Sequence, residues 1–497
     1  MYKIVIPSYK REKIIKQKTL TLLDKHNINK KDIYIFVEKS EIENYKNELP
    51  NYNIVAGAKG IGKQRTAISN YFEDNQVIVS LDDDVEEILD NGLPLANLHY
   101  FIKDTINFLH AHHLTLAGIY PVNNNYFTKN TITIDNRFLI GQFKIFINKK
   151  HLENRSYELL EDYQNSLKHA IWSGGLVRFN YITLKANYNS GKGGLKEYRT
   201  LERKLDEVKR FSLEYKNYCG TKKNGMEISI LKNPIRKELT TLWIGKEFNK
   251  LSKLSVVSWL RLGYKVNLYI NQNFRLPLDM KHWELNGQLI FHNANDILDT
   301  KKIKDILPFS DLWRYTYLYN HHGKTWIDAD MILLKQLPDD EIIISSEHTF
   351  ASGAYKSKES KICNIGVLRM PLGCPILKSI IDKINKTGLK NTEFCDNMKT
   401  FRTIINKSYY KKFITDQNFI VEPEVYCPIP WWNCKEIYYD TKYKTKYDVD
   451  VKSNDWILAN SIGIHMWNNF TFNKHEIDFS KIKVNSIYYR LFHFYLN

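Results

Sequence analysis

The chain begins with short apolar runs that alternate with segments of helical spacing. Residues 2–7 (YKIVIP), 33–38 (IYIFVE), 51–57 (NYNIVAG) and 77–81 (VIVSL) have the length and apolar character of buried strands. Between the first two runs, residues 18–27 (KTLTLLDKHN) repeat apolar positions at helical intervals. Strands and helices that alternate in this way predict a mostly parallel sheet with helices on its faces.

A second sheet begins near the middle of the chain. TTLWIGKE reads as a strand and is followed by the helical LSKLSVVSWLRLG and by the strand YKVNLYIN. Between the two halves, the charged helix KEYRTLERKLDEVKRFSLEYKNY leads into CGTKKNG, whose residues favour a turn. We therefore predict an α/β protein with a first domain at residues 1–218, a linker at 219–238 and a second domain at 239–497.

The composition is that of folded domains. Of the 497 residues, 43% are hydrophobic and 26% are charged, which excludes an intrinsically disordered chain and favours more than one core. No apolar run is long enough for a membrane span, and MYKIVIPSYKRE lacks the apolar core of a signal peptide. The six cysteines form no CxxC pair, so we expect free thiols and a cytoplasmic location.

The net charge of +17 favours an anionic partner, which could be nucleic acid, a membrane surface or a phosphorylated small molecule. Much of the excess is lysine scattered along a chain that is also rich in Asn, Ile and Tyr. A nucleic-acid-binding surface concentrates its charge on one face. The charge alone therefore does not select among these partners.

Clustered aspartates follow an apolar strand in each half. VIVSLDDDVEEI contains Asp82, Asp83 and Asp84, and TWIDADMILL contains Asp328 and Asp330. Carboxylates this close repel one another unless a cation compensates them. Strand alternation predicts that Asp328 and Asp330 point to one side, where both could face a Mg²⁺ or Mn²⁺ ion that holds a diphosphate. An isolated DxD is more often a solvated turn, but here apolar sequence resumes directly after it.

The stretch SDLWRYTYLYNHHGKTWIDADMILLK resembles the DXD-containing glycosyltransferases related to capsular polysaccharide enzymes, initiation-type α-mannosyltransferases and glucosylating toxins. The resemblance implies a GT-A fold, a nucleotide-sugar donor and a Mn²⁺ or Mg²⁺ ion bound most directly by Asp330. NIGVLRMPLGCPIL matches the family's segment on the acceptor side, and GIHMWNNF matches its C-terminal HxW element, in which His465 would complete the metal site. A departure is HHG, where many relatives have GG. The donor-binding residues that the resemblance implies are Asp311, Arg314, Asp328, Asn364, Trp467 and Asn468.

In the first half, GAKGIGKQ nearly forms a phosphate-binding P-loop. Gln64 stands where Ser or Thr should bind magnesium, which argues against an NTPase. We interpret the segment instead as a loop that opens a helix. Gly60 and Gly62 would let the backbone approach a nucleotide, and Lys63 and Arg65 would contact its phosphates.

Together with IVIPSYKR and VIVSLDDDVEE, this loop resembles inverting GT-A glycosyltransferases and is closest to the TET/JBP-associated group, which is linked to sugar addition on hydroxymethylated DNA bases. The resemblance implies that Asp84 binds the metal in this half. The donor-binding residues predicted here are Pro7, Tyr9, Arg11, Gly62, Lys63, Arg65 and Asp82.

LLEDYQNSL matches the ED motif of the same group, which makes Glu161 and Asp162 the predicted catalytic residues of this half. Asp162 would be the general base that deprotonates the acceptor hydroxyl. An ED pair on a helix is otherwise more often solvated surface charge. NSGKGGL at residues 189–195 resembles a Gly-rich segment that closes over the site. A base opposite the leaving group means inversion in the first half. The second half offers no such base, and its resemblance implies retention.

We therefore predict two tandem GT-A domains with Rossmann-like, mostly parallel sheets, and a bifunctional metal-dependent glycosyltransferase. It would move sugars from UDP- or GDP-sugar donors to a hydroxyl of a glycan, protein or lipid. One alternative is a transferase acting on hydroxymethylpyrimidines in DNA, although no helix-turn-helix or zinc finger is visible. Another is a chain in which one domain only binds, against which both acid clusters argue. No obligate protein partner is evident.

Overall fold

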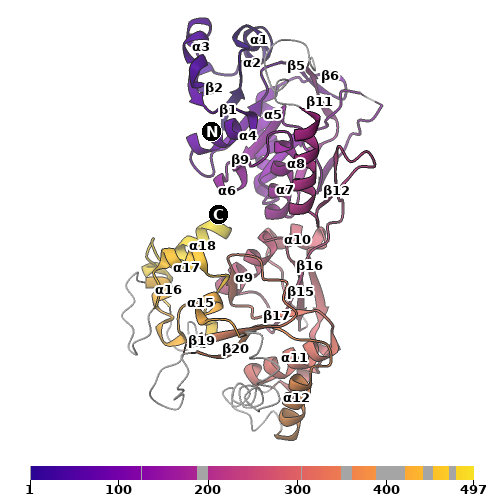
Figure 1. The fold of residues 1–497 in the computed structure, drawn as a ribbon, viewed down its shortest axis with the longest axis vertical. Helices are drawn as coiled ribbons and strands as arrows, with labels where there is room; N and C mark the ends of the chain where they lie inside the picture. The colour runs from indigo at the N-terminus through magenta and orange to yellow at the C-terminus, as the bar shows by residue number, and fades with distance from the viewer. Residues whose placement is uncertain are drawn as a thin grey trace. The chain divides into compact units, whose positions relative to one another are not determined.

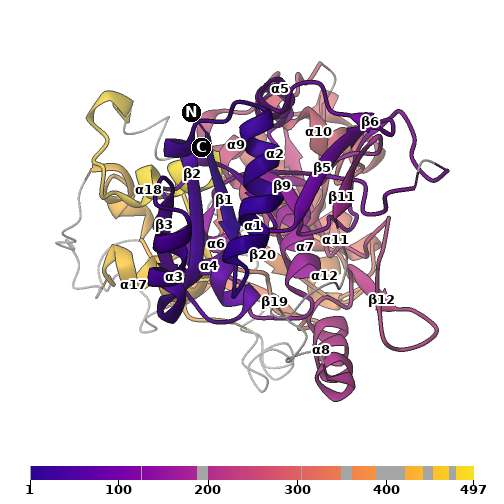
Figure 2. The same cartoon turned by 90° about the horizontal axis from the view of Figure 1, so that it is seen from above.

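The chain divides into two compact units, Met1–Ile235 (unit 1) and Arg236–Asn497 (unit 2), and this division lies inside the predicted linker. Figures 1 and 2 show the computed structural model in two views. The predicted Gly-rich segment at 189–195 lies outside the described residues. The structure describes residues 2–124, 126–186, 200–271, 273–303, 305–348, 361–387, 420–439, 451–469 and 477–496.

Unit 1 is built on an eight-stranded sheet with the strand order β3-β2-β1-β4-β9-β7-β10-β8. The first four strands in that order are parallel, β9 is antiparallel to both of its neighbours, and β10 is parallel to β7 and antiparallel to β8. The strands are β1 (Tyr2–Pro7), β2 (Ile33–Glu38), β3 (Asn53–Gly57), β4 (Val77–Leu81), β7 (Leu116–Ile119), β8 (Ile132–Asp135), β9 (Phe143–Ile147) and β10 (Leu176–Phe179).

Helices cover both faces of this sheet because its central strands are apolar on both sides. In β1, Ile4 and Ile6 belong to the core under α1, α2 and α5, whereas Val5 belongs to the core under α4 and α7 (Figure 2). In β9, Phe146 lies in this second core, so Lys144 points to the α7 side as well. The helices are α1 (Glu12–Gln17), α2 (Thr19–Lys25), α4 (Ile61–Tyr71), α5 (Leu98–Ala111) and α7 (Glu161–Ser173).

A small sheet and a hairpin complete unit 1. The small sheet has the order β11-β5-β6 and consists of β5 (Val85–Asp90), β6 (Leu93–Pro94) and β11 (Ile182–Ala186). Helix α8 (Leu201–Glu214) buries Val208 and Phe211 in a cluster with Tyr157. Cys219 and Ile228 join the same cluster from the hairpin β12 (Cys219–Thr221) and β13 (Ile228–Ile230). The first part of the predicted linker thus folds as part of unit 1.

Unit 2 has a six-stranded sheet in the order β16-β15-β14-β17-β20-β19. Its first four strands are parallel, and β20 is antiparallel to both β17 and β19. Aromatic residues of α11 (Ile306–Asn320), including Trp313 and Tyr317, pack on one face with Trp326. The strands are β14 (Glu238–Trp243), β15 (Lys265–Ile270), β16 (Leu289–Asn293), β17 (Thr325–Ile327), β19 (Ile343–His348) and β20 (Lys361–Arg369).

The DxD of unit 2 lies in a turn between two sheets, which corrects the predicted strand alternation. Strand β17 ends at Ile327, the Met331 N–H donates to the Asp328 carbonyl at 2.9 Å, and β18 (Met331–Leu333) then pairs with β21 (Gly463–His465) outside the main sheet. Apolar sequence resumes after the acids because β18 is a separate buried strand. Asp328 and Asp330 are therefore brought together by a turn and not by the period of a strand.

The fold is α/β, with one large, mostly parallel sheet in each unit, as predicted. Within the described parts of the chain, no helix has both the length and the apolar character needed to cross a bilayer. Five of the six cysteines fall in these parts, and each is a buried free thiol.

Candidate active sites

In unit 2, Asp328, Asp330 and His465 form the one group of three potential metal ligands found among the described residues. Their ligand atoms all lie within 4.8 Å of one another. The pairing of β18 with β21 places Met331 opposite His465, so the imidazole meets the end of the DxD turn. The distance from His465 Nε2 is 3.2 Å to Asp330 Oδ1 and 4.0 Å to Asp328 Oδ2.

The charges of this cluster suit a divalent cation. Burial alone would lower the pKa of His465, but the Asp330 carboxylate raises it well above its ordinary value. Burial would raise the pKa of Asp330, but His465 and the Asn468 N–H lower it. Two carboxylates of a half-buried turn and a buried imidazole are ligands that Mn²⁺ and Mg²⁺ accept. The residues present therefore fit the predicted metal, which Asp328, Asp330 and His465 would hold.

Mn²⁺ affinity is expected to rise with pH, because the metal binds the neutral imidazole and must displace the proton that Asp330 stabilises on His465. Below the raised pKa, the affinity should increase about tenfold per pH unit. Calorimetric titration with Mn²⁺ in two buffers of different ionisation enthalpy should show about one proton released per ion. Equal affinity at about pH 6 and about pH 8 would contradict this assignment.

Arg314 connects the DxD turn to α11. Its Nη1 lies 3.0 Å from Asp328 Oδ1, and its Nη2 lies 3.3 Å from Asp311 Oδ1. Nη1 also donates to the Ile365 carbonyl at 2.8 Å, and the guanidinium stacks over Trp326 at 4.7 Å. Asp311 and Arg314 are buried, so the structure brings together both predicted donor residues of α11 and the first aspartate of the DxD.

Asn364 reaches the same turn from β20. Its Oδ1 accepts from the Gly366 N–H at 2.7 Å, and its Nδ2 donates to Glu347 Oε2 at 2.9 Å. A methyl group on Gly366 would lie 2.8 Å from Asn364 Oδ1 and 3.3 Å from Asp328 Oδ2, so glycine is required for this close approach. Glu347 is buried on β19 and fixes the orientation of the Asn364 amide. No motif in the sequence marks this glutamate as part of the site.

The HxW element closes the cluster from β21. The Asn468 N–H donates to Asp330 Oδ2 at 2.7 Å, which holds the carboxylate in place. Trp467 stacks on His465 with ring centroids 4.0 Å apart, and its indole N–H donates to the Ile429 carbonyl at 2.7 Å. Cys427 Sγ lies 3.9 Å from His465 Nδ1, on the side of the ring away from Asp330. Every residue predicted for this site is therefore in or next to one cluster.

In unit 1, the DDD segment follows β4 as the DAD segment follows β17. Asp83 is buried and accepts from Ser8 Oγ at 2.6 Å and from Arg11 Nη1 at 3.0 Å. Burial raises the pKa of Asp83 to about 6, although Arg11 opposes the shift. Arg11 Nη1 also lies 3.5 Å from Asp84 Oδ2. Pro7 and Tyr9 precede Arg11 at the end of β1, so these predicted donor residues share one sheet edge with the acids.

The predicted metal ligand Asp84 has a guanidinium beside it. No group of three potential ligands includes Asp84 in the part of unit 1 that the structure describes. A cation there would lie close to the positive charge of Arg11. The fit of the residues to a metal is therefore not shown at Asp84, and its metal role stays a prediction.

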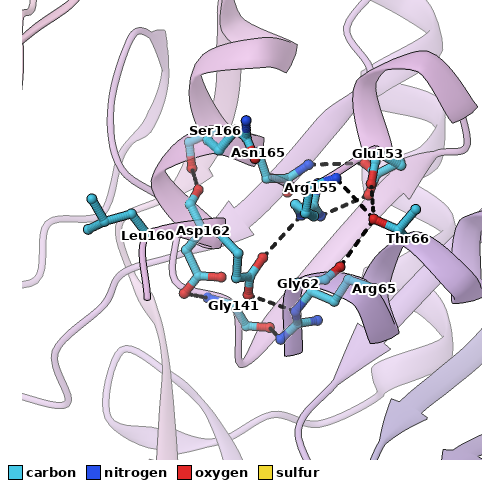
Figure 3. Close-up of polar contacts among 12 residues, drawn as sticks. Gly62, Arg65, Thr66, Gly141, Glu153, Arg155, Leu160, Asp162, Asn165 and Ser166 are labelled. Atoms are coloured by element: carbon cyan, nitrogen blue, oxygen red, sulfur yellow. Dashed lines mark hydrogen bonds and ion pairs between the residues drawn. The ribbon is translucent and has the colours of Figure 1, made fainter. Parts of the chain in front are cut away.

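Arg65 is the centre of the second acidic group of unit 1. Its Nε donates to Glu161 at 2.8 Å, its Nη1 to Ser80 at 2.9 Å, and its Nη2 to Asp82 and to the Gly141 carbonyl, both at 3.1 Å. Burial lowers the pKa of Arg65, but the Glu161 and Asp82 carboxylates outweigh it, and the net shift is upward. Arg65 on α4 therefore contacts Ser80 of β4 by a hydrogen bond, Asp82 after β4 by a partly exposed ion pair, and Glu161 of α7 by a buried ion pair. Figure 3 shows Arg65 beside Gly141 and Asp162.

Asp162 lies at the first turn of α7 and points toward Gly141 (Figure 3). Its Oδ2 accepts from the Gly141 N–H at 3.0 Å, and its Oδ1 accepts from Lys144 Nζ at 3.2 Å. Burial and the adjacent Glu161 carboxylate raise the pKa of Asp162, whereas the two arginines Arg65 and Arg155 help to lower that of Glu161. A carboxylate whose pKa lies closer to neutral pH is a stronger general base for a hydroxyl proton than an ordinary aspartate.

Gly62 and Lys63 lie near Glu158 and not in the acidic group around Arg65. The Gly62 N–H donates to Glu158 Oε2 at 3.0 Å, and an added Cβ would lie 2.4 Å from the Tyr157 carbonyl oxygen, so packing alone requires glycine here. Lys63 is exposed and lines a pocket of about 690 Å³ with Glu158 and Arg203. In the described part of unit 1, neither residue forms a hydrogen bond or ion pair with Asp82 or Asp84, and their donor role stays a prediction.

The comparisons with known proteins concern the fold. No protein-family model matches the chain, and no curated protein matches it by sequence. Among solved structures it is similar to the PaToxG glycosyltransferase, with 13% identity, a TM-score of 0.26, and coverage of 43% of this chain and 81% of that one. It is similar to glucosyl-3-phosphoglycerate synthase from Mycobacterium tuberculosis in complex with Mn²⁺, UDP and glucosyl-3-phosphoglycerate, with 10% identity, a TM-score of 0.27, and coverage of 47% and 90%.

The bifunctional IspDF from Campylobacter jejuni is similar to a comparable degree, with 13% identity, a TM-score of 0.23, and coverage of 36% of this chain and 48% of that one. The likeness is distant in each case and gives no basis for an activity. The α/β class of the chain follows from its own two sheets, and the solved structures to which it is distantly similar include glycosyltransferases.

Proposed function

We propose that the chain is a bifunctional, metal-dependent glycosyltransferase that moves sugars from nucleotide-sugar donors to hydroxyl acceptors, with one active site in each unit. The observation that carries the proposal is the cluster of Asp328, Asp330 and His465. These ligands come from two segments that are remote in the sequence, and buried Arg314 supports them from a third. Such a convergence of carboxylates, imidazole and guanidinium is suited to a metal–diphosphate.

In unit 2, Asp330 and His465 would hold Mn²⁺ or Mg²⁺, and Asp328 would face the same ion. When bound, this ion neutralises charge on the departing nucleoside diphosphate. The chain's own residues supply the rest: Arg314 keeps Asp328 in place, and Asn364 presents an amide fixed by Glu347. The sequence resemblance, which implies retention, supports a transfer in which a donor phosphate oxygen accepts the acceptor's proton.

In unit 1, Asp162 would take the proton of the acceptor hydroxyl as the new glycosidic bond forms and the bond to the diphosphate breaks. The raised pKa of Asp162 suits that role. Attack on the face opposite the leaving group gives inversion. Arg11 lies just after the carboxyl end of β1, where its guanidinium could form an ion pair with the donor phosphates.

The donors are proposed to be UDP- or GDP-sugars, and the acceptor is a hydroxyl of a glycan, protein or lipid. A donor screen tests the proposal. The full chain is incubated with a panel of UDP- and GDP-sugars with Mn²⁺, and released UDP or GDP is measured. We expect at least one donor to be turned over, and chelation of the metal should stop the reaction of unit 2. The proposal is wrong if no donor is turned over while Mn²⁺ binds normally.

A further inference from the structure

Lys144 is a buried lysine in the middle of a sheet strand. It lies on β9, whose other four residues are all apolar and buried, and its side chain is 2% exposed. Lysine is almost never fully buried unless it is paired, since its charge loses hydration there. A chain that keeps an ammonium group at this position has a structural or chemical use for it.

The ammonium has two partners, and both are on α7. Nζ lies 3.2 Å from Asp162 Oδ1 and 3.2 Å from Asn165 Oδ1. Asn165 is held with its oxygen toward Lys144, because its Nδ2 donates to Glu153 Oε1 at 3.0 Å (Figure 3). Asn165, held by Glu153, therefore fixes the direction of the Lys144 side chain, and the ammonium group also donates to Asp162.

The other buried acids of this region already have cations of their own. Glu153 pairs with Arg155 at 2.8 Å, and Glu161 pairs with both Arg155 and Arg65. The side chains of Glu153 and Glu161 are 2% and 6% exposed, whereas that of Asp162 is 27% exposed. Asp162 is thus the carboxylate of this group that an acceptor can reach, and Lys144 is the cation in direct contact with it.

We propose that Lys144 is a positioning residue for Asp162, which aims the carboxylate and keeps it ionised until the acceptor proton arrives. The inference rests on the proposed function of unit 1. In the reaction the acceptor proton moves to Asp162 as the acceptor oxygen bonds to the anomeric carbon and the diphosphate leaves with its electron pair. Lys144 keeps its own proton throughout. It offsets the charge of Asp162 before transfer and stays hydrogen-bonded to the neutral acid afterwards.

The direction of the pH effect follows from the groups that face Asp162. Glu161 on α7 disfavours the ionised carboxylate, whereas Lys144 on β9 and Arg65 on α4 favour it. Burial and Glu161 raise the pKa of Asp162, and Lys144 lowers it. Without Lys144, the pKa of Asp162 should therefore rise further. Transfer by unit 1 requires ionised Asp162, and the acidic limb of its pH profile should therefore move to higher pH.

The experiment uses the full chain with Asp330→Ala, so that only unit 1 turns over donor. The kcat/KM for transfer by Lys144→Met is measured from about pH 5 to about pH 9. We expect the acidic limb to move to higher pH by at least about one pH unit. At a pH below the limb, kcat/KM should then be about tenfold lower than in the parent. The donor KM should stay within about twofold of the parent. Lys144→Arg keeps the positive charge, so its acidic limb should lie close to that of the parent. Lys103→Met, an exposed lysine of α5, should leave the profile unchanged.

A uniform loss at every pH would show that Lys144 only supports the fold and would overturn the inference. If Lys144→Met does not fold, Asn165→Asp serves instead, because a second carboxylate beside Lys144 should also raise the pKa of Asp162 and move the limb upward. An unmoved limb in folded Asn165→Asp also overturns it. Asp162→Asn in the same background separates the two claims. If that variant is as active as its parent, the proposed base is wrong, and if it is inactive while the limb of Lys144→Met is unmoved, only the role of Lys144 is wrong.

Discussion

Replacing Asp330 by alanine is expected to abolish Mn²⁺ binding by unit 2 and to slow donor turnover there by roughly 10³-fold. Asp330 makes the closest contact to His465, at 3.2 Å, and its other oxygen accepts the Asn468 N–H at 2.7 Å. Alanine removes one metal ligand and releases both of these groups. Released UDP or GDP, measured with a donor that only unit 2 uses, reports the loss.

The control for this variant is Asp455→Ala, which removes an exposed aspartate of unit 2 whose partner is Arg490. It should keep full turnover and full Mn²⁺ affinity, because surface ion pairs contribute little to a fold. Asp330→Asn adds a test of charge. It keeps the shape and one acceptor oxygen but removes the negative charge that raises the pKa of His465. If Asp330→Ala binds Mn²⁺ as tightly as the parent chain, the metal site has been placed wrongly.

Much of the fold was predictable because its signals are local. The apolar runs at the start of each half became β1, β2, β3 and β14, and the acids that follow β4 and β17 lie at the carboxyl edges of their sheets. In unit 2, Asp328, Asp330 and His465 come from two of the segments that carry the sequence resemblance, and they meet in one cluster. The motifs were informative there because Arg314, Gly366 and His465, each from a different segment, all contact the DxD turn.

The remaining features depend on contacts between distant segments. Asp328 and Asp330 were expected to share a side by strand alternation, but a turn between two sheets brings them together, which strand spacing cannot reveal. Arg65 was predicted from its loop, yet its pairing with Glu161 joins positions 96 residues apart. Lys144 was missed although a lone lysine inside FKIFI was a visible signal. Glu347 gave no comparable signal, since its role depends on its pairing with β20.

Replacing Asp162 by asparagine is expected to slow sugar transfer by unit 1 by about 10²- to 10⁴-fold, because the acceptor hydroxyl loses its base. An asparagine oxygen can still accept either the Gly141 N–H or the Lys144 ammonium, so the local structure should persist. The acidic limb of the transfer profile should disappear, since it is the raised pKa of Asp162 that places this limb above the ordinary range of an aspartate. Transfer by unit 2, measured in the same sample, is the internal standard.

Glu161→Gln is the matched comparison, because Glu161 stabilises the fold through ion pairs, whereas Asp162 is the proposed base. Glu161 is paired with Arg65 and Arg155 inside the fold, and breaking such a buried pair costs about 3 to 5 kcal/mol of unfolding free energy. We therefore expect Glu161→Gln to lower stability in a denaturant titration. Asp162→Asn also takes the charge partner from buried Lys144, but the Asp162 side chain is 27% exposed, so we expect it to lower stability less than Glu161→Gln and to slow transfer greatly. If instead Glu161→Gln is stable but inactive and Asp162→Asn is active, the base is Glu161. Glu161 could accept a proton only if Arg65 and Arg155 no longer paired with it.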